Sequence, residues 1–258
     1  MKKLDQQDKI YLLLALFIGA LLAANFLGAK ITAFAVPAAL AIFLNAIFWP
    51  IIFVVNLAAS PLPDYQIINN PFLAYNFFNT IHVSVGILTV PVMFLITDII
   101  EEVMGKKTAQ KFVNAALGVM IFVIIITTIS VGLPPDPSRQ YFSQEAYKNI
   151  FGVSLRMMVA SIIAFILAQY HDIWAFNFWK KKTSGKWLWL RNNASTIVSQ
   201  LIDSIAFMFI AFYAITPQFN VVYIFSLIMP YWIFKVLFAL LDTPFCYLGV
   251  KWLKNENK

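Results

Sequence analysis

Several ionisable side chains of this chain lie deep inside apolar runs, where each requires a partner or water. Asp203 lies near the middle of the apolar run 194–215, and Lys235 lies within the run 221–250. A charged side chain at the centre of a bilayer costs about 2.5–3.5 kcal/mol on insertion scales. Charges that persist at such a cost either pair with each other or line the pathway of a polar solute.

Helical spacing places many of these groups on shared faces. Asp98 and Glu102 are four residues apart, so they occupy one face of a helix. One stripe of the stretch 191–212 is polar: Asn192, Thr196, Ser199, Gln200 and Asp203. Five predicted helices contribute polar groups to one expected cavity: Asn25, Asp98 with Glu102, Gln169 with Asp172, Gln200 with Asp203, and Lys235.

The same groups also have purely structural interpretations. Asp98 and Glu102 repel each other when both are ionised, unless a nearby cation such as Lys106 neutralises them. Asp203 and Lys235 fall at similar depths on consecutive antiparallel helices, so a buried ion pair between them is an alternative to a binding role. Both interpretations remain open at the level of the sequence.

The composition excludes an ordinary soluble domain. Of 258 residues, 61% are hydrophobic and 12% are charged, and the mean hydropathy is +0.77. The net charge of +7 comes from short Lys and Arg clusters between apolar runs, which is typical of cytoplasmic membrane loops and argues against nucleic-acid binding. Cys246 is the only cysteine, so we expect no disulfide and no thiolate metal site, and we assign no role to His171. We expect no cofactor.

Seven apolar runs are candidates for membrane spans: 10–29, 36–59, 83–104, 112–133, 154–173, 194–215 and 221–250. Lysine clusters at 2–9, 106–111, 180–191 and 251–258 place those segments in the cytoplasm. Both ends of the chain are then cytoplasmic, and an odd number of crossings must precede residue 60. A count of seven spans with an external N-terminus is the alternative.

We therefore predict one all-α, polytopic membrane domain over 1–258, with six transmembrane helices. Residues 36–80 form an apolar insertion on the outer side. Pro37, Pro50, Pro61 and Pro63 favour a broken, re-entrant or interfacial element there over a plain span.

With these motifs identified, the sequence resembles the queuosine-precursor transporter family, also called the vitamin uptake transporter family. The resemblance covers most of the chain except the insertion 36–80. It rests on several motifs in one order: 25–30, Thr97-Asp98-Ile99-Ile100-Glu101-Glu102-Val103-Met104-Gly105, Gln169 and Asp172 followed by Phe176, 192–212, and Phe234-Lys235-Val236-Leu237. Glu101 stands where the family commonly has threonine, which changes the local charge.

The resemblance implies an importer of the bacterial inner membrane for 7-deazaguanine precursors of queuosine, such as the 7-cyano and 7-aminomethyl compounds. A carboxylate such as Asp98 or Asp203 can accept two neighbouring N–H groups of the base. Gln200, Asn25 or Lys235 can donate to its carbonyl oxygen. The aromatic rings Phe207, Trp232 and Phe234 are candidates for stacking on the base.

Three alternatives to a self-sufficient importer remain. The chain lacks the phosphate loop G-x-x-x-x-G-K-[ST], so we do not expect it to hydrolyse ATP, but an ATPase module or a homodimer is open as a partner. The spacing of Asp98 and Glu102 also fits a magnesium-dependent intramembrane transferase, although no second acidic cluster accompanies it. A structural or assembly protein is the third class. We expect no enzymatic activity.

Overall fold

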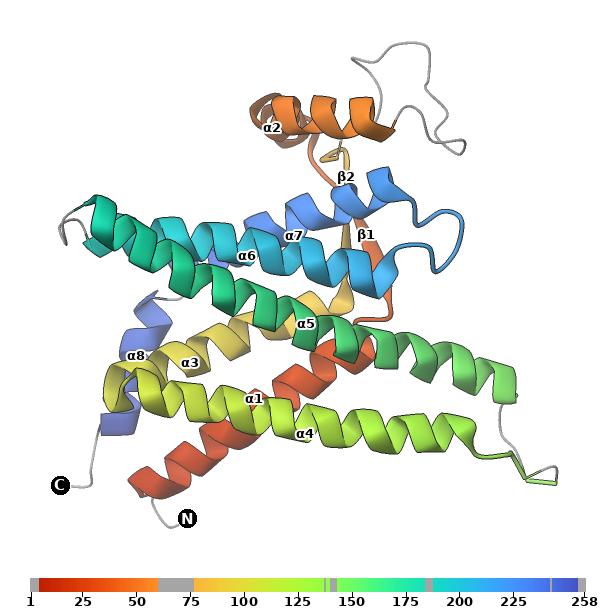
Figure 1. The fold of residues 1–258 in the computed structure, drawn as a ribbon, viewed down its shortest axis with the longest axis horizontal. Coiled ribbons are helices and arrows are strands. Elements are labelled where there is room, and N and C mark those ends of the chain that lie inside the picture. The colour runs from red at the N-terminus through yellow and green to blue at the C-terminus, as the bar shows by residue number, and fades with distance from the viewer. Residues whose placement is uncertain are drawn as a thin grey trace. The chain divides into compact units, whose positions relative to one another are not determined.

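The computed structural model describes residues 5–59, 77–136, 138–139, 143–183, 188–241 and 243–254. Its elements, shown in Figure 1, are α1 (Gln6–Leu27), β1 (Ile31–Ala35), α2 (Ala38–Ala59), β2 (Thr80–Ser84), the 3-10 helix η1 (Val85–Thr89), α3 (Val90–Met104), α4 (Lys106–Gly132), α5 (Gln144–Lys182), α6 (Leu188–Phe212), α7 (Val221–Leu241) and α8 (Thr243–Lys254). The predicted all-α, polytopic membrane protein is confirmed. β1 and β2 form one small two-stranded sheet that we did not predict.

Five helices in the described part of the chain are long and apolar enough to cross a membrane: Gln6–Leu27, Ala38–Leu57, Lys107–Gly132, Gln144–Ala168 and Val221–Phe238. The predicted run 83–104 is shorter as a helix, because Pro91 lies in the first turn of α3 and lacks the N–H that would continue a helix from upstream. The predicted run 221–250 contains two helices, α7 and α8, with Pro244 in the first turn of α8.

The chain divides into two compact units, which we describe separately. Unit 1 comprises Met1–Lys30, Ser84–Val159 and Lys235–Lys258, and unit 2 comprises Ile31–Val83 and Ala160–Phe234. Helices α5 and α7 each contribute to both units.

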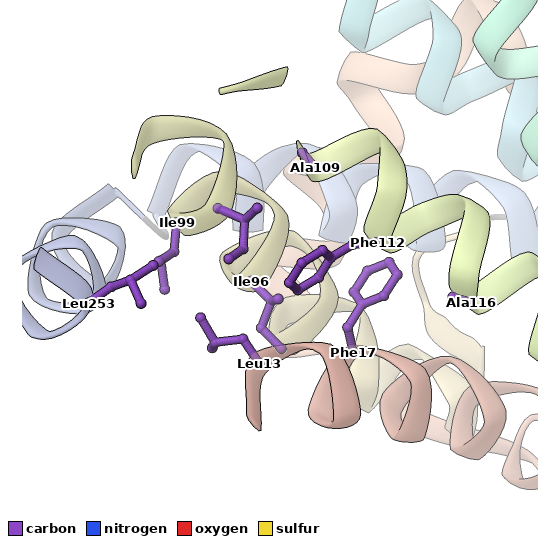
Figure 2. Close-up of a cluster of buried hydrophobic side chains, with 9 residues drawn as sticks. Leu13, Phe17, Ile96, Ile99, Ala109, Phe112, Ala116 and Leu253 are labelled. Carbon is purple, nitrogen blue, oxygen red and sulfur yellow. The ribbon is translucent and has the colours of Figure 1, made fainter. Parts of the chain in front are cut away.

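One end of unit 1 is held together by a buried apolar cluster from α1, α3, α4 and α8 (Figure 2). Its members are Leu13, Phe17, Ile96, Ile99, Ile100, Ala109, Phe112, Ala116 and Leu253. At this end the Lys9 ammonium donates to the carbonyl oxygen of Trp252 at 2.8 Å and lies 5.3 Å from the centre of its indole ring. The start of α1, the end of α8 and the turn between α3 and α4 therefore lie together. Gly105 forms that turn with φ of 83°, a conformation that favours glycine.

The opposite end of α1 packs closely against η1 within unit 1. The Ser84 hydroxyl donates to the carbonyl oxygen of Gly28 at 2.8 Å and accepts from the Gly86 N–H at 3.3 Å. A Cβ atom on Gly86 would meet the carbonyl oxygen of Ala24, and it would lie 3.2 Å from the Ala24 carbonyl carbon. The contact needs glycine because the obstructing atoms belong to rigid backbone.

Replacing Gly86 by alanine should therefore destabilise the protein by about 1–3 kcal/mol, the usual cost of overpacking. Thermal unfolding of the purified protein in detergent measures this change. Gly118→Ala on α4 is the matched control, because a Cβ there meets nothing within 4 Å. Equal melting temperatures for the two variants would contradict the proposed close contact.

In unit 2, the two ends of the insertion lie side by side. β1 pairs with β2, and the Val36 N–H donates to the carbonyl oxygen of Asn79 at 3.2 Å. The Asn45 amide of α2 donates to the Asn79 side chain at 3.1 Å and accepts from the Phe78 N–H at 3.2 Å. On β2, His82 packs edge-on against Tyr223 of α7, and burial lowers the pKa of its imidazole. The segment 36–79 thus begins and ends at one place.

The helix of the insertion is continuous across Pro50. The broken form expected from the prolines is therefore wrong for this helix, whereas the re-entrant and interfacial forms stay predictions. An internal proline removes one backbone hydrogen bond, which apolar membrane helices tolerate when the remaining polar groups are satisfied. Pro61 and Pro63 lie outside the described residues.

Candidate functional site

Asn25 is buried in unit 1, as expected for a polar residue that faces the protein interior. Its side chain is 2% exposed. The amide nitrogen donates to the carbonyl oxygen of Leu21 at 2.8 Å and lies 3.7 Å from the sulfur of Met120 on α4. These two contacts match the two donor hydrogens of a primary amide. The predicted donation from Asn25 to a substrate would therefore require exchange of one of these contacts.

The acidic residues of α3 lie on the side of the helix away from the unit 1 cluster. Ile96, Ile99 and Ile100 are buried in that cluster. Asp98 and Glu102 are exposed, one helical turn apart, as their spacing predicted. These two carboxylates are therefore not part of the apolar core of unit 1.

In unit 2, α5 and α6 are joined by a hydrogen bond that sequence reasoning missed. His171 Nδ1 and Ser199 Oγ lie 3.0 Å apart, and the Ser199 side chain is 4% exposed. Ser199 belongs to the polar stripe predicted on 191–212, so that stripe meets α5 here. The polar stripe indicates that some polar residue of α5 should face it. Helical spacing pointed to Gln169 and Asp172 as that partner and not to His171. The side chains of Gln169 and Asp172 lie outside the described residues.

The polar stripe of α6 also faces aromatic residues of α7. The rings of Phe207 and Tyr231 are stacked, with centroids 6.4 Å apart and an interplanar angle of 17°. Asp203, one turn before Phe207, is half-buried and acts electrostatically on the Tyr231 hydroxyl. Trp232 donates from its indole N–H to the carbonyl oxygen of Ile197 at 3.1 Å. A carboxylate thus lies beside an aromatic pair at the contact of α6 and α7.

Tyr231 is the second residue that sequence reasoning missed. It is 7% exposed, and it lies on α7 one turn before Lys235. We predicted Phe207, Trp232 and Phe234 as aromatic candidates, and of these Phe207 forms the stacked pair with Tyr231. Gln200 lies on α6, one turn before Ser204, and its side chain is half-buried.

Lys235 is 6% exposed in α7, which confirms that this cation is buried. Burial of an ammonium requires an anionic or hydrogen-bonding partner. Among the described residues no group of three or more His, Cys, Asp or Glu side chains is placed to hold a metal ion.

Known proteins resemble this chain over more than half of its length. The family described as "Putative vitamin uptake transporter" matches residues 84–249. The chain is 30% identical over 168 residues to the probable queuosine precursor transporter of Bacillus subtilis (strain 168), covering 64% of this chain and 71% of that protein. It is 31% identical over 159 residues to the queuosine precursor transporter of Escherichia coli (strain K12), covering 62% and 68%. The chain belongs to the vitamin uptake transporter family. No solved structure matches it.

The vitamin uptake transporter match includes all the predicted site residues except Asn25, which lies before residue 84. The insertion 36–80 lies wholly before the matched region. Unit 1 holds Asn25, Asp98, Glu102 and Lys235, and unit 2 holds Gln169, Asp172, Gln200 and Asp203. Convergence of these residues on one cavity stays a prediction.

Proposed function

We propose that this member of the vitamin uptake transporter family imports 7-deazaguanine precursors of queuosine, namely the 7-cyano and 7-aminomethyl compounds. The proposal is supported by the family match and by the names of the relatives, which are described as queuosine precursor transporters. The observation that carries it is the half-buried carboxylate of Asp203 beside the stacked rings of Phe207 and Tyr231.

This arrangement suits a planar base with neighbouring N–H donors. A carboxylate accepts two parallel N–H bonds, and such charge-assisted pairs are roughly twice as strong as neutral ones. Stacking of a base on an aromatic side chain contributes about 1–3 kcal/mol. In the proposed site, Asp203 accepts from the base edge, and the Phe207 and Tyr231 pair offers a ring edge or face within one turn of it. Gln200 donates to the base carbonyl.

The direct test is restoration of tRNA modification. A strain that lacks both queuosine synthesis and its own importer receives this chain, and queuosine in tRNA is measured at low external precursor. We expect modification to be restored with either the 7-cyano or the 7-aminomethyl compound. Absence of modification, despite normal amounts of the protein in the membrane, would contradict the proposed substrate.

Small residues on one exposed face of α1 form a candidate surface for a partner protein. On α1, Ala15 and Gly19 are exposed, and a Cβ on Gly19 would meet nothing within 4 Å. Small exposed residues allow close approach of another helix. A homodimer or an ATPase-module partner on this face stays a prediction.

We further propose that both ends of the chain face the cytoplasm. The support comes from unit 1, where Lys9 contacts Trp252 and where the α3–α4 turn joins the same end. Exposed Lys107, Lys111 and Lys251 belong to the helices that meet there. Lysine-rich ends of membrane helices face the cytoplasm in most proteins. The opposite end of α1, near Ser84, would then be external.

The insertion is external in this proposal. The chain leaves unit 1 at Lys30 and returns at Ser84, and the N–H of the next residue, Val85, donates to the Lys30 carbonyl oxygen at 2.9 Å. A segment that leaves and returns at one point crosses the membrane an even number of times. A return crossing after α2 would have to use 60–76, which contains Asp64 and three prolines and is shorter than the roughly 20 apolar residues required. We therefore expect α2 to make no net crossing, although its length would allow one.

Cysteine labelling tests this topology. In a Cys246→Ser background, single cysteines at Ala38 and Leu57, near the two ends of α2, should both react in intact cells with a membrane-impermeant maleimide. Ala39→Cys and Val54→Cys, close to the two labelled positions, are controls: they show whether a lack of reaction reflects local burial of one side chain and not its side of the membrane. Protection of the 57 position alone, relieved by permeabilising the membrane, would indicate a single crossing and contradict the external insertion.

A further inference from the structure

The short helix α8 has three distinct faces. One face packs on the other helices of unit 1, where Leu253 is fully buried and a Cβ on Gly249 would collide with the side chain of Ile99. A second face is apolar and exposed, formed by Phe245, Leu248 and Trp252. The third face consists of Tyr247, Lys251 and Lys254. These residues follow one another at intervals of about one helical turn, and all three are exposed. A surface helix that only covered a protein core would not need the second face.

The length of α8 excludes a membrane crossing. Its 12 residues extend about 18 Å, whereas the hydrocarbon core is about 30 Å thick. An apolar face next to a lysine-bearing face is typical of helices that lie in the plane of the membrane interface. Tyrosine and tryptophan are enriched at that depth, and lysine side chains extend from it to the headgroups.

Contacts within unit 1 hold α8 at the end of the bundle where lysines gather. Lys9 of α1 donates to the Trp252 carbonyl oxygen, which anchors the last turn of α8. Lys107 and Lys111 of α4 are exposed, and α4 contributes to the same buried cluster as Leu253. Glu101 and Glu102 of α3, with Asp5 and Asp8 at the start of α1, are acids at this end that offset part of this charge. The sequence 243–254 itself contains two lysines and no carboxylate, so the face of α8 is cationic.

We propose that α8 lies in the headgroup layer of the membrane and that Tyr247, Lys251 and Lys254 form a binding site for an anionic phospholipid headgroup. The lysines pair with the negatively charged headgroup, and the tyrosine hydroxyl donates to its phosphate oxygens. Phe245 and Leu248 contact the upper part of the acyl chains. Charge complementarity selects an anionic lipid, because a zwitterionic headgroup brings no net negative charge to two adjacent ammonium groups.

Lipid retention by the whole protein tests this site. Purified protein is reconstituted in nanodiscs of phosphatidylcholine alone or of phosphatidylcholine with phosphatidylglycerol, and bound lipid is measured by native mass spectrometry after extraction. A lysine near an anionic surface contributes about fivefold in affinity, so Lys251→Gln with Lys254→Gln should weaken phosphatidylglycerol retention about 30-fold. Lys148→Gln, at an exposed lysine in the first turns of α5, is the control and should change retention little.

Two further measurements separate a specific site from a general loss of folding. Binding of phosphatidylglycerol to the unmodified protein should fall at high salt, because exposed charges are screened. Leu248→Asp should also reduce retention while leaving the buried face intact. Equal retention of phosphatidylglycerol by the unmodified protein and the double lysine variant would overturn the proposal, as would retention that is insensitive to salt.

Discussion

Replacing Asp203 by asparagine is expected to reduce uptake of a labelled 7-deazaguanine precursor about 100-fold at low concentration. Asparagine has the same shape, but one of its two terminal groups is an N–H₂ donor that would face an N–H donor of the base. Loss of one hydrogen bond to a charged group costs about 1.5–3 kcal/mol, and the second donor adds repulsion. The effect should appear as a higher KM, because the contact forms on binding.

Asp136→Asn provides the matched control for this change. Asp136 is exposed in the loop after α4, and its carboxylate accepts from the Ser138 N–H at 2.8 Å and from the Ser138 hydroxyl at 2.7 Å. The same chemical change there should leave uptake within about twofold, since exposed substitutions away from special features have small effects. Both variants must reach the membrane in equal amounts for the comparison to hold.

A substrate analogue makes the assignment of Asp203 more specific. A deazapurine that lacks the 2-amino group removes one of the two donors that the carboxylate is proposed to accept. The unmodified protein should discriminate against this analogue, whereas Asp203→Asn should not, because the lost partners belong to the same contact. Equal discrimination by both proteins would assign recognition of the 2-amino group to a residue other than Asp203.

The helices could be predicted from the sequence because each depends on local information. Apolar runs of about 20 residues identify α1, α4, α5 and α7, and the alternation of polar residues on 191–212 identifies the face of α6. Lysine positions predicted that the start of α1 and the end of α8 share one side of the membrane; Lys9 lies beside Trp252, so these two ends are close together, but the side on which they lie stays a prediction. Where the prediction depended on the length of an apolar run, it agrees with these four helices, whereas the topology derived from charge counts stays a prediction.

The features that could not be predicted depend on contacts between residues far apart in the sequence. The pairing of β1 with β2 joins positions on either side of the insertion, and no local pattern announces it. His171 meets Ser199 because α5 and α6 pack at a particular rotation, and a lone histidine gives no signal of that rotation. In the sequence, Tyr231 resembles the other apolar positions of a membrane helix. Only the fold shows that its ring stacks on Phe207.

Lys235→Met is expected to destabilise the protein by roughly 3–5 kcal/mol, the cost of removing one member of a buried charged interaction. Lys235 is 6% exposed, so its ammonium is compensated inside the protein, and methionine would leave the compensating group without its partner while filling a similar volume. Thermal unfolding in detergent measures the loss. Lys148→Met, at an exposed position on α5, should change the melting temperature little.

Uptake by a double variant then decides between a structural and a functional role for these charges. If Asp203 and Lys235 served only to neutralise charge, replacing both by leucine would remove both buried charges, and stability and uptake would recover together. A role in binding predicts a different result. Stability can recover, but uptake stays absent, because no carboxylate remains to accept the N–H donors of the base. A stable double variant with normal uptake would therefore reject the importer site proposed at α6 and α7 and favour simple charge neutralisation within the membrane.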